Sequence, residues 1–152
     1  MLADQQLQDV THLIQLSVAP VFLLTAAGTT LAVLSTRLAR IVDRGRVLEK
    51  RLSRANPGEA APMRDELGTL VRRARLVHLA LTFGAASALC VCLLITTAFV
   101  GFTLDARFAP AIAALFVAAT LFFAGALVLF LREVFLAIRH FRLGASRLPP
   151  AT

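Results

Sequence analysis

Three stretches of the chain lack Asp, Glu, Lys and Arg altogether, and charged residues separate them. The stretches are residues 10–36, 76–104 and 108–131. Each exceeds the about 20 mostly apolar residues that an α-helix needs to cross a bilayer. The pattern therefore predicts an all-α membrane protein with three transmembrane helices, at about residues 13–35, 77–102 and 109–131.

Helical spacing continues past the first apolar stretch into the charged segment 37–75. Apolar or small residues recur at alternating intervals of four and three, in two sets: Leu34, Leu38, Ile41, Gly45, Leu48 and Leu52, then Met63, Leu67, Leu70, Ala74, Val77 and Leu81. We call each of these two sets a seam, because its residues share one helix face. Two seams joined by a short connection predict an antiparallel helical hairpin between spans one and two. Asn56-Pro57-Gly58 is the expected turn, and Pro62 suits the first position of the returning helix.

The composition fits a single membrane domain. Hydrophobic residues make up 58% of the chain and charged residues 16%, against about 25% charged in soluble proteins. We expect the domain to cover residues 1–145, because Gly144 suits the end of a helix. Residues 146–152, which include two prolines, are expected to form a flexible tail.

The net charge of +7 is concentrated on one side of the predicted spans. Segment 37–75 has eleven basic and five acidic residues, and the chain after residue 131 has four and one. Cytoplasmic loops carry the excess of Lys and Arg, so we predict the N-terminus outside and both the hairpin and the C-terminus in the cytoplasm. The same distribution favours contact with the lipid bilayer and its anionic head groups over nucleic-acid binding.

Span one carries a mildly polar stripe made of Gln15, Thr25, Thr29 and Thr36, which fall within about 80° on a helical wheel. Polar side chains of this kind bond to neighbouring helices or to carbonyls of their own helix. The first interpretation is therefore an interface. The alternative is the lining of a pore in a homo-oligomeric ion channel.

Arg37, Arg40 and Arg44 are three and four residues apart, so they share one helix face at the inner end of span one. Anchoring to anionic lipid head groups is the first interpretation of this face. A ring of arginines at the inner mouth of an oligomeric pore, or an anion site shared between subunits, is the alternative.

Span two repeats a small residue every four positions, at Ala80, Gly84 and Ala88. Small residues at this spacing let helices approach closely, so this face is predicted to pack on another helix, within the chain or between chains. Cys90 and Cys92 lie in the same span, but residues two positions apart on a helix point about 200° from each other and cannot bridge.

Metalloprotease, phosphate-loop, dinucleotide-binding and nucleophile-elbow motifs do not occur in the sequence. We therefore predict no catalytic residue, no metal site and no cofactor. The chain is interpreted as a non-enzymatic, self-associating membrane protein whose basic hairpin recruits a partner. The ion channel is the alternative.

Several runs of sequence resemble one known family. They are Ala19-Pro20, Phe22-Leu23-Leu24, Arg37-Leu38-Ala39-Arg40-Ile41-Val42-Asp43-Arg44-x-Arg46 and Arg72-Arg73-Ala74-Arg75-Leu76. They resemble a bacterial family of small inner-membrane proteins catalogued as domain of unknown function twenty-seven twenty-one, over roughly residues 10–140. The resemblance implies a place in the bacterial inner membrane and a number of helices, and it implies no activity.

Overall fold

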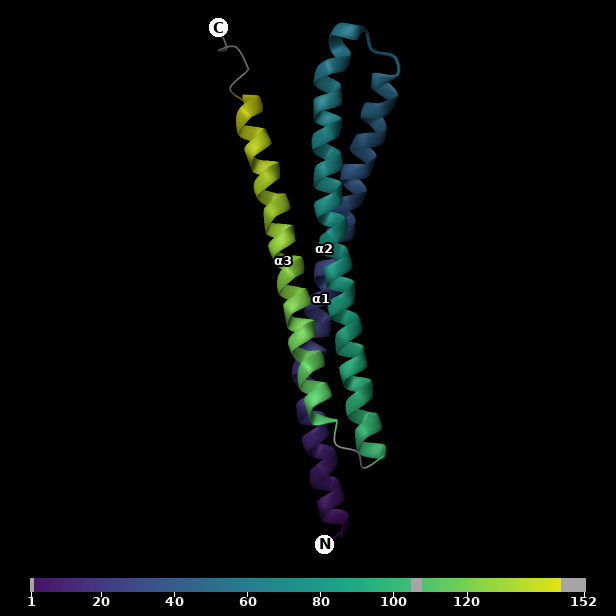
Figure 1. The fold of residues 1–152 in the computed structure, drawn as a ribbon, viewed down its shortest axis with the longest axis vertical. Coiled ribbons are helices and arrows are strands. Elements are labelled where there is room, and N and C mark those ends of the chain that lie inside the picture. The colour runs from purple at the N-terminus through teal and green to yellow at the C-terminus, as the bar shows by residue number, and fades with distance from the viewer. Residues whose placement is uncertain (1, 105–107, 146–152) are drawn as a thin grey trace. The chain divides into compact units, whose positions relative to one another are not determined.

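The computed structural model describes the backbone of residues 2–104 and 108–145, and the side chains of 18–56, 58–101, 103–104 and 108–137. Within these ranges the regular structure is entirely helical: α1 (Leu2–Leu52), α2 (Pro57–Thr103) and α3 (Ala109–Ala145) (Figure 1). Each helix holds a stretch long and apolar enough to cross a membrane. The prediction of an all-α chain with three potential membrane spans is thus confirmed by helix length and composition. The predicted tail, 146–152, lies outside the described residues.

The connection between α1 and α2 differs from the predicted one. The helix α2 begins at Pro57, five residues before Pro62, and the connection is residues 53–56. Proline suits the first helical position because its missing N–H would have no intrahelical partner there. The carbonyl of Asn56 accepts bonds from the backbone N–H groups of Glu59 (3.0 Å) and Ala60 (3.1 Å), which starts the helix. Pro62 lies inside the first turns, where it removes only the bond to the carbonyl of exposed Gly58.

The chain divides into two compact units. One consists of Met1–Ala32 and Thr82–Gly125, and we call it the apolar unit. The other consists of Val33–Leu81 and Ala126–Thr152, and we call it the basic unit, since it holds almost all the arginines. Each helix contributes to both units.

Close contacts in the apolar unit are made by small residues. A Cβ added at Gly84 would lie 3.0 Å from Cδ2 of Leu31, so α1 and α2 approach closely there. The hydroxyl of Ser87, which is fully buried, donates to the carbonyl of Ala119 on α3 at 2.8 Å. Many large apolar side chains remain exposed, and the apolar stretch of α3 is the least buried of the three. Such a surface suits lipid as its solvent.

The basic unit has a continuous apolar core. Its buried residues are Leu34, Ile41, Leu48, Leu70, Val77 and Ala80, with Leu38, Met63, Leu67, Ala74, Leu81, Leu129 and Phe130 packed against them. Every residue of the second predicted seam is in this set, together with most of the first. The heptad spacing therefore identified the residues that α1 and α2 bury against each other, and α3 adds two more.

Candidate functional site

One carboxylate of the basic unit is buried, and it belongs to Glu133. Glu133 follows the last charge-free stretch by two residues and is the only acidic residue after Asp105. Its side chain is 0% exposed on α3. A buried carboxylate is costly unless it is paired and hydrogen-bonded, so its surroundings decide what it does.

Each oxygen of this carboxylate accepts hydrogen bonds from a different arginine. Nε and Nη2 of Arg73, on α2, donate to Oε1 of Glu133 at 3.1 and 2.7 Å. Nη1 of Arg37, on α1, donates to Oε2 at 3.0 Å. The guanidinium of Arg37 also lies 4.9 Å from the ring centre of Phe130, one turn before Glu133. We call Arg37, Arg73 and Glu133 the ion triad, and it joins all three helices.

The triad carries a net charge of +1 in a partly solvated setting. The side chain of Glu133 is fully buried, whereas 25% of Arg73 and 41% of Arg37 remain exposed. Water can therefore solvate the excess positive charge, while the carboxylate depends on its two partners. With both oxygens engaged by permanently charged donors, the site suits structural fastening and leaves the carboxylate no free oxygen for a substrate.

The chain matches one family model, described as "Protein of unknown function (DUF2721)", over residues 17–143. It belongs to the DUF2721 family. The matched residues include all three members of the triad, and the resemblance drawn from the sequence is confirmed. No curated protein and no solved structure matches the chain.

A second ion pair, which is exposed, joins α1 and α2 of this DUF2721 member. Nε and Nη2 of Arg44 donate to Oε1 of Glu66 at 3.1 and 2.8 Å. Both side chains are about half exposed, at 54% and 44%. Exposed pairs contribute about 0–1 kcal/mol, so this contact aligns α1 and α2 without holding them strongly.

The threonines of the predicted polar stripe are exposed. Thr25 donates its hydroxyl to the carbonyl of Val21 at 3.0 Å, and Thr29 donates to that of Thr25 at 2.9 Å. Thr36 is exposed as well. The side chain of Gln15 lies outside the described residues. The stripe as an interface or a pore lining stays a prediction.

The three arginines at the inner end of span one differ in environment. Arg37 bonds to Glu133 and Arg44 to Glu66, whereas Arg40 is exposed. Their assignment to lipid head groups or to a pore mouth stays a prediction.

The small residues of span two fall in both units. Ala80 is buried in the core of the basic unit, Gly84 lies against Leu31 in the apolar unit, and Ala88 is half-buried. Packing of this face between chains stays a prediction.

No other chemical centre emerges from the residues whose side chains the structure describes. Among them, no three His, Cys, Asp or Glu side chains converge as metal ligands would. Cys90 and Cys92 are free thiols.

Sequence reasoning missed Glu133 and the role of Arg73. Glu133 is 96 residues from Arg37 and 60 from Arg73, so no local spacing connects them. The available signal was a lone acid among basic residues, two positions beyond an apolar stretch. An acid at the end of a span is expected to have a named partner, and arginines were the obvious candidates.

Proposed function

We propose that this DUF2721 protein is a non-enzymatic component of the bacterial inner membrane, with its N-terminus outside. In this proposal residues 37–75 form an antiparallel hairpin in the cytoplasm that recruits an acidic protein partner. The third helix is fastened to the base of the hairpin through the ion triad.

The order of contacts supports the antiparallel arrangement. Arg44 of α1 bonds to Glu66 of α2, and Arg37, seven residues earlier, shares Glu133 with Arg73, seven residues later. From the first contact to the second, the residue number decreases on α1 and increases on α2. This order is typical of two antiparallel helices. The cytoplasmic placement is supported by the excess of basic residues in the same segment.

The exposed basic surface at the end of α1 is the observation that carries the recruitment proposal. Arg46, Lys50, Arg51 and Arg54 are all exposed, and we call them the tip patch. None of the four has an acidic partner among the residues whose side chains are described. Exposed Glu49 lies in the same segment, yet residues 46–54 keep a net charge of +3 from four basic residues and one acidic residue. A surface with an excess of one sign steers and orients a partner of the opposite sign. Within the part of the chain whose side chains are described, the ion pairs of segment 37–75 involve Arg37, Arg44 and Arg73. The exposed basic residues of the tip patch can therefore bind an acidic partner.

Self-association is the second part of the proposal. The hydroxyls of Thr25 and Thr29 are satisfied by their own helix, so this exposed face needs no water and suits contact with a second copy. A water-filled pore would gain less from hydroxyls already engaged. The interface is therefore favoured over the ion channel.

Site-directed photocrosslinking in cells tests the recruitment. A photoreactive residue replaces exposed Ser53, next to the tip patch, in the full-length protein. We expect a protein adduct of one discrete mass, reduced at least about fivefold when Arg51→Glu and Arg54→Glu are added. A photoreactive residue at Val128, 58% exposed on α3, is the control and should not give this adduct. Absence of the adduct at Ser53, or its survival after charge reversal, would contradict the proposal.

A further inference from the structure

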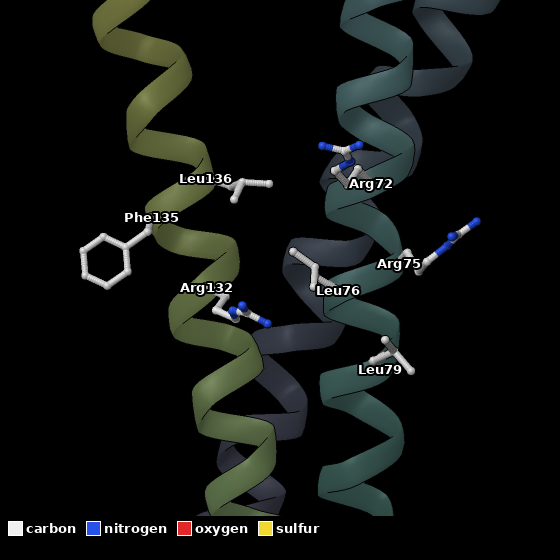
Figure 2. Close-up of a pocket in the computed structure, with 7 residues that line it drawn as sticks. All are labelled: Arg72, Arg75, Leu76, Leu79, Arg132, Phe135 and Leu136. Carbon is white, nitrogen blue, oxygen red and sulfur yellow. The ribbon is translucent and has the colours of Figure 1, made fainter.

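A pocket of about 530 Å³ lies between α2 and α3 within the basic unit (Figure 2). The helix α2 contributes Arg72, Arg75, Leu76 and Leu79, and α3 contributes Arg132, Phe135 and Leu136. Its volume is within the about 300–1,000 Å³ of typical small-molecule sites. The pocket takes no part in the ion triad or the tip patch.

The lining combines free positive charge with apolar surface. Among the residues whose side chains are described, none of the pocket's three arginines has an acidic partner, unlike Arg37, Arg44 and Arg73. In Figure 2, Arg132 and Leu136 extend from α3 toward α2, and Leu76 extends from α2 toward α3. Arg72 lies at the level of Leu136, while Arg75 points away from α3 and Phe135 points away from α2. The occupant therefore needs an anionic group and an apolar body.

The place of the pocket along the chain narrows the choice of occupant. The second charge-free stretch begins at residue 76 and the third ends at 131. The lining residues of α2 therefore straddle the start of one apolar stretch, and those of α3 begin one residue after the end of the other. At such a boundary, hydrocarbon gives way to lipid head groups. The exposed fractions of the lining residues Leu79 (41%) and Phe135 (59%) show that apolar surface beside the pocket is open to a lipid chain. A soluble acidic protein would leave this apolar surface uncovered.

We propose that this pocket binds one anionic phospholipid. Its phosphate lies between the guanidiniums of Arg72 and Arg132, because basic pockets between membrane helices on the cytoplasmic side select anionic head groups. Its acyl chains pass over Leu76 and Leu79 toward the apolar stretch. The head-group contact thus falls to arginines that form no ion pair with the described residues, in addition to any contact made by Arg40.

Native mass spectrometry of the full-length protein in detergent tests the site, with phosphatidylglycerol, phosphatidylcholine and inorganic phosphate as separate probes. The wild type should retain one phosphatidylglycerol at least about tenfold more than phosphatidylcholine. Arg72→Gln with Arg132→Gln should lower that retention at least about tenfold. The matched control, Arg46→Gln with Arg54→Gln, removes the same charge from the tip patch and should leave retention unchanged.

Leu136→Trp tests the same pocket by filling it while keeping every charge. This variant should also lose the phosphatidylglycerol adduct. If the double arginine variant does not fold, Leu136→Trp alone tests whether the lipid binds in the pocket. Equal loss in the pocket and control variants, equal retention of both lipids, or displacement of the lipid by millimolar inorganic phosphate would each overturn the proposal. Partner recruitment is tested at the tip patch and lipid binding at the pocket, so either proposal can fail while the other holds.

Discussion

Arg73 places two guanidinium N–H groups on one oxygen of Glu133, at 3.1 and 2.7 Å, although the residues are 60 positions apart. The other oxygen remains available for Arg37, which occupies it at 3.0 Å. One buried carboxylate of α3 therefore fastens α1 and α2 together at the base of their shared core. Loss of the Glu133 carboxylate would therefore leave two arginines on two other helices without their counter-charge.

Glu133→Gln is expected to lower the free energy of unfolding by about 2–3 kcal/mol. The amide leaves two arginines without a counter-charge and turns N–H donors toward guanidinium donors. The cost stays below the about 3–5 kcal/mol of a fully buried pair because both arginines reach water. Titration with SDS in mixed micelles measures the change. Glu66→Gln, in the exposed pair, is the control and should cost less than about 1 kcal/mol; equal costs would contradict the triad's role.

Double-mutant cycles should give a larger coupling energy between Arg73 and Glu133 than between Arg37 and Glu133. Arg73 makes two bonds and is 25% exposed, whereas Arg37 makes one and is 41% exposed. Fewer bonds and more water weaken the second pair. The cycles use Arg73→Gln and Arg37→Gln, each combined with Glu133→Gln, under the same SDS titration. A reversed order would show that the packing of Arg37 on Phe130 matters more than its exposure suggests.

The periodic parts of this fold were predictable from sequence, and the triad was not. Leu34, Ile41 and Val77 fell on the predicted seams and are buried together, because a heptad repeat fixes which helix face is covered. Glu133 obeys no repeat, and its partners come from two other helices. Ion pairs between distant segments form only once the fold brings those segments together, so local residue spacing does not predict them.

The predicted start of α2, at Pro62, was wrong because local sequence offered two equivalent positions. Pro57 and Pro62 both suit a first helical position, and spacing alone could not rank them. The carbonyl bonds made by Asn56 select the earlier one. The polar stripe of span one was recognisable as a helix face, but whether Thr25 and Thr29 meet a second copy depends on a partner that one chain does not contain.

Gly125→Ala should destabilise the apolar unit by about 1–2 kcal/mol, the usual cost of overpacking. Its Cβ would lie 2.7 Å from Cδ1 and 3.0 Å from Cε1 of Phe83. That ring is held edge-on against Phe122, with centroids 5.8 Å apart, so it yields only at the expense of this contact. Gly28→Ala is the control, since nothing lies within 4 Å of its added Cβ, and it should be neutral or stabilising. Similar results for both variants in SDS titration would show that the Phe83 ring moves freely.

Ser87→Ala should cost about 0.5–1 kcal/mol in the same assay. Its buried hydroxyl donates to the carbonyl of Ala119 at 2.8 Å, linking α2 to α3. Hydrogen bonds between membrane helices average about 0.6 kcal/mol, because the separated helices find other partners. Thr97→Ala is the comparison: its hydroxyl donates to the carbonyl of Leu93 on its own helix, so its loss should cost less. A larger cost for Thr97→Ala would contradict the role of Ser87 between helices.

In the proposed topology, three spans place the basic hairpin on the inner side of the membrane. Single cysteines at Arg54 and at Leu104, both exposed, test it in a background where Cys90→Ser and Cys92→Ser remove the native thiols. With a membrane-impermeant maleimide on intact cells, the cysteine at 104 should be labelled at once and that at 54 only after permeabilisation. Labelling of position 54 in intact cells would contradict the account.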